Sequence, residues 1–171
     1  MTTASTHLTR GTEDPKPHTP PLSLFLAYIA MVPTAAGALT AAVLPARASA
    51  SVSRLTTAWA GAILCFLAGV RRGLSFRQGG GPTVEQIASM FGVFVLGAGA
   101  LLLPRRVPAL VLLLLGYGGE AVLGPVAAER GEAPQYFARL RPAQMIVPVA
   151  SLLVLLAVER RRARGREAPR T

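Results

Sequence analysis

Apolar residues fall in five long runs along the chain, and short polar or Arg-rich links separate them. A hydrocarbon core about 30 Å thick needs about 20 helical residues, a length that four runs reach and that the last run approaches. Backbone amides in lipid must be paired within their own segment, and the alternation of a barrel strand is absent, so each run predicts a helix. The runs cover approximately Leu22–Leu44, Thr56–Phe76, Val84–Pro104, Val107–Ala127 and Pro142–Val158.

The links between the runs are too short to hold a separate domain. We predict them at Pro45–Leu55, Arg77–Thr83, Arg105–Arg106 and Ala128–Arg141. The expected fold is therefore an all-α membrane protein, a single antiparallel five-helix transmembrane bundle over residues 21–159. Residues 1–20 are polar and lack apolar periodicity, which predicts a flexible N-terminal tail, and residues 160–171 form an Arg-rich C-terminal tail.

Composition supports a membrane location. Hydrophobic residues make up 51% of the chain and charged residues 15%, whereas a soluble domain carries about 25% charged residues. This balance excludes a soluble globular enzyme and a disordered basic protein. The net charge is +10, and Lys16 is the one Lys among 18 basic residues. Such an Arg bias is typical of a GC-rich bacterial genome, and the composition as a whole predicts a multi-pass membrane protein in contact with the lipid bilayer.

An odd number of spans places the two termini on opposite faces of the membrane. We name the face that holds the N-terminus side A and the opposite face side B. Side B has the slightly larger number of arginines, mostly in the C-terminal tail, so the positive-inside rule favours a cytoplasmic C-terminus. Clustered Arg also fits nucleic acid, but this tail lacks aromatic residues and begins where a span ends. Contact with lipid headgroups is therefore favoured, and no nucleic-acid partner is expected.

Small residues recur every four positions in the second run. They are Gly61, Cys65, Gly69 and Gly73, and we name this set the small-residue ridge. Small side chains let two helix backbones approach closely, so the ridge predicts a helix contact within the bundle or between copies of it. On this interpretation Cys65 is a small packing residue and not a reactive thiol.

Charged residues inside the predicted spans carry the functional interest, because charge near membrane depth is costly. Alternation of the helices brings several of them to side A. This candidate polar cluster consists of Arg71, Arg72, Glu120, Tyr136, Arg139 and Arg141. Glu120 lies between Gly116 and Gly124 at helical spacing, on the side of its helix expected to meet protein. We expect Glu120 to be ionised and paired with one of the four arginines.

Two interpretations of the candidate polar cluster remain open. It is either a structural clamp that pairs helix ends, or a substrate vestibule or proton path. The clamp is favoured, because arginines near helix ends can extend to the interface and no dedicated motif surrounds them.

Signals for catalysis and for metal binding are missing from the predicted spans. Both His residues, His7 and His18, lie in the N-terminal tail, and Cys65 is the one Cys, so no Cys/His metal cluster can form. The sequence also has no nucleophile–base motif and no carboxylate pair at useful spacing. We predict no catalytic, cofactor-binding or metal-binding residues, and no enzyme activity.

Two segments resemble signatures of the domain of unknown function 3429 family. Trp59–Leu74, WAGAILCFLAGVRRGL, resembles its second-helix signature, and Pro134–Arg141, PQYFARLR, is similar to the signature before its last helix. Val32-Pro33 is similar to the Leu-Pro of its first helix. The resemblance covers about residues 22–158. It implies a small multi-pass protein of bacterial inner membranes, with mitochondrial relatives and no established activity, cofactor or substrate.

The chain departs from the family pattern at several positions. Cys65 stands where the family tends to have Ser, Arg72 where it has Trp, and Tyr136 where Trp is usual. Any site role implied by the resemblance therefore rests mainly on Arg71, Arg139 and Arg141.

Three functional hypotheses follow from these observations. The first is a structural or accessory inner-membrane component, which forms a homo-oligomer or joins a larger membrane complex through its glycine-lined helices. The alternative is a small transporter or channel subunit with a polar vestibule at one membrane face, although no inverted repeat is evident. A membrane enzyme is the least supported, because the catalytic signals are missing.

Overall fold

The computed structural model describes residues 19, 21–76 and 81–167, and these residues form helices and short connections with no strand. The helices are α1 (Pro21–Ile29), α2 (Val32–Val43), α3 (Ala46–Ser75), α4 (Val84–Leu102), α5 (Arg106–Glu129) and α6 (Phe137–Glu167). Five segments are long and apolar enough to cross a membrane, with α1 and α2 together forming the first. The prediction of an all-α fold with five such helices is confirmed. The predicted N-terminal tail, apart from Thr19, and residues 168–171 of the C-terminal tail lie outside the described residues.

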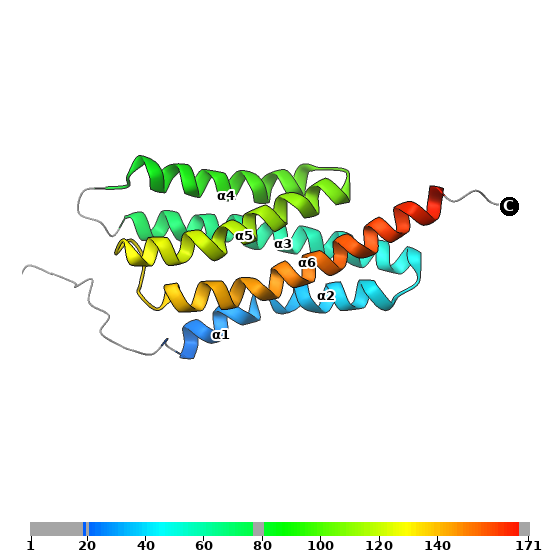
Figure 1. Cartoon of the computed structure of the whole chain (residues 1–171), viewed down its shortest axis with the longest axis horizontal. Coiled ribbons are helices and arrows are strands. Elements are labelled where there is room, and N and C mark those ends of the chain that lie inside the picture. The colour runs from blue at the N-terminus through cyan, green and yellow to red at the C-terminus, as the bar shows by residue number, and fades with distance from the viewer. Residues whose placement is uncertain (1–18, 20, 77–80, 168–171) are drawn as a thin grey trace, which may run out of the picture.

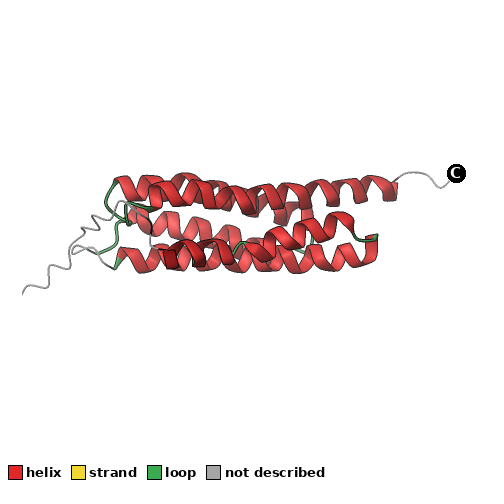
Figure 2. Cartoon of the chain, turned by 90° about the horizontal axis from the view of Figure 1, so that it is seen from below, coloured by secondary structure: helices red, strands yellow, loops and turns green. Residues whose placement is uncertain are grey.

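The helices run lengthwise along one axis and form a closed ring (Figures 1 and 2). Each long helix packs against the next in the chain, and α6 packs back against α2. Contacts between α3 and α5 cross the middle of the ring. Side A therefore gathers the end of α3, the start of α4, the end of α5 and the start of α6. Side B gathers the end of α2, the start of α3, the α4–α5 connection and the end of α6.

The first predicted helix is divided in two at a proline. Pro33 has no N–H to donate to the carbonyl of Ile29, and its ring crowds that carbonyl, so α1 ends at Ile29 and α2 begins at Val32. The connection closes by a tighter bond in which Met31 N donates to Tyr28 O at 2.9 Å. The indole Nε1 of Trp59 donates to the carbonyl of Ala30 at 3.0 Å, which satisfies an acceptor at the break. The prediction of one continuous helix over Leu22–Leu44 is wrong at this point.

The predicted link Pro45–Leu55 is also wrong, because α3 begins at Ala46. The segment contains no Gly or Pro after Pro45, and its Ala residues favour helix. Its serines made it look like a loop in a hydropathy pattern. Ser49 and Ser53 are instead fully buried, and Ser49 Oγ donates to the carbonyl of Ala41 on α2.

The last helix extends well beyond the predicted run Pro142–Val158 at both ends. The polar turns before Pro142 and after Val158 are helical, so α6 reaches from Phe137 to Glu167 and includes the first part of the predicted Arg-rich tail. At 1.5 Å per residue, α3 and α6 are each about 45 Å long, close to the thickness of a bilayer with its headgroup regions. Their polar ends therefore fall at headgroup level.

Apolar side chains fill the centre of the ring and also cover its outside. Leu64, Leu110, Leu113, Leu152 and Leu155 have no exposed surface and form the core. Large apolar side chains on the outer surface come from every helix, as a surface in contact with lipid acyl chains requires. Among them are Phe25, Val43, Phe66, Phe91, Val122 and Ile146.

Candidate functional site

An ion pair between α3 and α5 forms the centre of the candidate polar cluster. Arg71 Nε donates to Glu120 Oε1 at 2.6 Å, and the two side chains are 14% and 1% exposed. The pair lies near side A, where α3 and α5 contact each other across the middle of the ring. Of the four arginines that the sequence offered as partners of Glu120, the geometry selects Arg71.

Helix geometry explains why Arg72 does not share this contact. Adjacent helical residues point about 100° apart, so only one of two neighbouring arginines can face α5. Arg72 Nη1 donates to Ser75 Oγ at 3.2 Å, and its guanidinium lies 4.2 Å from the centre of the Phe76 ring. Arg72 therefore interacts with the last turn of its own helix.

The second buried guanidinium of the cluster comes from α6. Arg141 is 6% exposed, and its side chain crosses the face of α5 at Gly124. A Cβ atom at Gly124 would lie 2.8 Å from Arg141 Cγ, so the glycine leaves the space that the arginine occupies. The guanidinium lies 4.7 Å from the centre of the Phe137 ring, and its Nη1 is 3.4 Å from Gln144 Oε1.

Gln144 belongs to this site, although it was not among the predicted residues, whereas Tyr117 bonds α3 to α5 further from side A. Gln144 is 3% exposed, and its Nε2 donates to the carbonyl of Ala27 at 2.8 Å, which links α6 to α1. The fully buried Tyr117 donates its hydroxyl to the carbonyl of Ala60 at 2.8 Å, one turn of α5 from Glu120. A polar residue three positions after Arg141, on the same face of the helix, was the available signal for Gln144.

Tyr136 and Arg139 lie outside the buried part of the site. Tyr136 is half-buried, and its ring centre is 5.0 Å from that of Phe137 in an edge-to-face arrangement. Arg139 is exposed. The structure thus gathers Arg71, Glu120 and Arg141 and leaves the other members of the candidate polar cluster around them.

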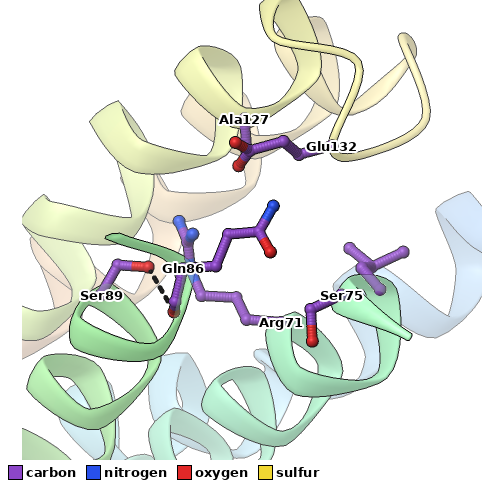
Figure 3. Close-up of a pocket in the computed structure, with 7 residues that line it drawn as sticks. Arg71, Ser75, Gln86, Ser89, Ala127 and Glu132 are labelled. Atoms are coloured by element: carbon purple, nitrogen blue, oxygen red, sulfur yellow. Dashed lines mark hydrogen bonds between the residues drawn. The ribbon is translucent and has the colours of Figure 1, made fainter. Parts of the chain in front are cut away.

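Two small cavities flank Arg71. The first lies between the end of α3, the start of α4 and the end of α5, and Figure 3 shows Arg71, Gln86 and Ser89 on one side of it and Glu132 on the other. The second lies between α3, α5 and α6, and Arg71, Glu120 and Arg141 all line it. Each has a volume of about 20 Å³, the space of a single water molecule. Two cavities of this size admit water and exclude an organic solute in this conformation.

The small-residue ridge is in contact over half of its length. A Cβ atom at Gly97 of α4 would lie 2.9 Å from Cys65 Sγ and 3.0 Å from Gly61 O, so α3 and α4 approach closely there. Gly69 and Gly73 are exposed, and a Cβ atom at either would meet nothing within 4 Å. As a contact within the bundle, the predicted ridge is correct for Gly61 and Cys65 and wrong for Gly69 and Gly73. A four-residue repeat turns by about 40° per step around a helix with 3.6 residues per turn, so the ridge drifts out of the contact with α4.

A second polar group, which the sequence analysis did not select, lies at side B. Glu159 Oε1 accepts from Arg106 Nη1 at 3.0 Å and from Arg162 Nη1 at 3.2 Å. Glu159 is 12% exposed, so this group is less buried than Glu120. A carboxylate three residues before an Arg on one helix was the available signal.

Comparisons with family models, with characterised proteins and with solved structures find no match to this chain. Within the described residues, no group of three or more His, Cys, Asp or Glu side chains could hold a metal ion.

Proposed function

We propose that this chain is a structural or accessory component of the bacterial inner membrane, whose buried polar contacts hold its helices in one arrangement. The Arg71–Glu120 ion pair is the observation that carries this proposal. Its Glu side chain is 1% exposed, and the pair joins residues 49 positions apart. Breaking such a pair leaves a buried charge without compensation, so it opposes separation of α3 from α5.

The exposed half of the small-residue ridge supports an accessory role. Gly69 and Gly73 leave an open strip on α3 toward side A, and close helix packing in lipid uses such residues. We propose that this strip receives a helix of a second copy or of a larger membrane complex. The resemblance to the domain of unknown function 3429 family supports the membrane assignment, and membership of that family is part of the proposal.

Purification in a mild detergent tests the accessory role. The wild-type chain should elute as a complex larger than a monomer, and Gly69→Leu should elute as a folded monomer, because its side chain enters open space within one copy. Gly92→Leu is the matched control, since Gly92 on α4 is also exposed and also meets nothing within 4 Å. Complex formation that survives Gly69→Leu would contradict the proposed contact.

The alternative, a small transporter or channel subunit, has one observation in its favour. Polar residues surround two adjoining cavities at one membrane face, and Arg71 lines both. Solute flux into vesicles that contain the purified chain would support this function. Flux that Glu120→Gln abolishes, with the fold retained, would favour it over the accessory role.

A further inference from the structure

The cavity between α3, α5 and α6 has an excess of positive charge. Two guanidiniums, from Arg71 and Arg141, and one carboxylate, from Glu120, line it. No carboxylate of the described residues lies within 4.0 Å of Arg141, whose polar and aromatic contacts, Gln144 and Phe137, are neutral. Glu120, the one carboxylate of this cavity, is already bonded to Arg71, so the 94% buried Arg141 guanidinium is costly unless a further counter-charge is supplied.

Arg71 has an unused donor at the same place. Its Nε is bonded to Glu120, but its Nη2 is buried and has no hydrogen-bond partner among the described residues. A buried donor without a partner is unfavourable, and buried polar groups in proteins are nearly always bonded. Arg71 and Arg141 thus have donor capacity left on the wall of one cavity.

The position of these donors along the membrane normal restricts the ligand. Arg71 lies about one turn before the end of α3, and Arg141 about one turn after the start of α6. Because these helices are about as long as the whole bilayer is thick, their terminal turns lie at the level of lipid headgroups. The anions concentrated at this level are phosphates.

We propose that this cavity is a phosphate-binding site, in which the guanidiniums of Arg71 and Arg141 hold one phosphate oxygen. A cavity of about 20 Å³ accepts an oxygen atom, while the rest of the anion stays at its mouth. A singly charged phosphodiester would balance the two guanidiniums and the one carboxylate, and guanidinium donors match phosphate oxygens well. Glu132 lines the neighbouring cavity and not this one, so the anion lies on the Arg141 side of Arg71. The source of the phosphate is either a lipid headgroup or the free anion.

Thermal unfolding of the full chain in a neutral detergent tests the site. Phosphatidylglycerol is added in one arm, a diacylglycerol, which has no phosphate, in a second, and inorganic phosphate in a third, at equal ionic strength. Stabilisation by phosphatidylglycerol alone identifies a lipid headgroup, and stabilisation by inorganic phosphate identifies the free anion. Either result supports the proposal, whereas stabilisation by neither anion, or equally by the diacylglycerol, overturns it.

Arg141→Gln assigns the effect to this cavity. Losing a charged donor should weaken the apparent affinity by about tenfold or more. Arg130→Gln is the matched control, because Arg130 is a 57% exposed arginine at the same end of the bundle. The affinity of this variant for the stabilising anion should equal that of the wild type.

Arg141→Lys replaces Arg141→Gln in this test if Arg141→Gln does not fold. It keeps the charge and loses the planar donor pair, so the affinity of this variant for the anion should also fall. Affinity unchanged in the Arg141 variant, or lowered equally in Arg130→Gln, would overturn the site.

Discussion

The two ends of the bundle each place a glutamate between arginines, but they bury it to different degrees. At side A, Glu120 is 1% exposed and accepts from Arg71, which belongs to another helix. At side B, Glu159 is 12% exposed and is shared by Arg106 of α5 and Arg162 of its own helix. Long side chains near a helix end can extend to water when a partner is lost, and those at side B have that freedom. The same ion-pair chemistry is therefore expected to fix helix positions at side A and to contribute little at side B.

Removal of the carboxylate at side A should have the largest effect. Glu120→Gln keeps the shape of the side chain and leaves Arg71 without its counter-charge, so unfolding should become easier by about 3 kcal/mol, the lower part of the range for buried pairs. Thermal or denaturant unfolding in detergent measures this loss. A change below about 0.5 kcal/mol would place Glu120 among ordinary surface residues.

Filling the space at Gly124 should have the next largest effect. Gly124→Ala brings a methyl group against Cβ and Cγ of Arg141, which cannot move without shifting α6, and overpacking of this kind costs about 1–3 kcal/mol. Gly92→Ala is the control, because its methyl group meets nothing within 4 Å and helix propensity favours Ala over Gly by about 1 kcal/mol. Both are measured by unfolding in detergent, and equal results for the two variants would refute the close approach of Arg141 to α5.

Loss of the carboxylate at side B should matter less. Glu159→Gln leaves two arginines that can turn toward the headgroups, so the expected loss is about 1 kcal/mol, near the upper value for exposed pairs. The same unfolding assay compares it with Glu120→Gln. If Glu159→Gln costs as much as Glu120→Gln, burial is not what separates the two ends.

The exposed pair at side A provides the smallest expected effect. Arg130 Nη1 and Glu85 Oε2 are 2.8 Å apart, but the side chains are 57% and 78% exposed. Glu85→Gln should therefore change stability by less than about 0.5 kcal/mol, an effect that added salt reduces further. A larger loss, unaffected by salt, would mean that this pair is shielded by lipid or by a partner.

The spans could be predicted from sequence because apolar runs of this length have no other stable arrangement in lipid. The first turns of α3 could not, because their serines resemble a loop until the bond from Ser49 to the Ala41 carbonyl and the burial of Ser53 are known. Helical spacing placed Glu120 on a protein-facing side with Gly116 and Gly124, and the structure puts Leu64 and Arg141 against those glycines.

The choice between Arg71 and Arg72 required the packing of whole helices. At 3.6 residues per turn, Arg72 lies on the same side of α3 as Gly61. The contact of that side with α4 ends at Cys65, and Arg71 faces α5 instead. Spacing along one helix fixes which residues share a face, but it does not determine which helix that face meets. The predicted cluster was therefore correct in its location near side A and incomplete in its partners, since it lacked Gln144.

A double-mutant cycle between Arg71→Gln and Glu120→Gln tests the central claim most directly, with unfolding free energy in detergent as the measured quantity. Because the two side chains are bonded and buried, their coupling energy should be about 1–3 kcal/mol. The parallel cycle between Arg72→Gln and Glu120→Gln should be additive within about 0.5 kcal/mol, since Arg72 contacts its own helix terminus. Additivity in the Arg71 cycle, or a larger coupling in the Arg72 cycle, would contradict the account of how α3 is held on α5.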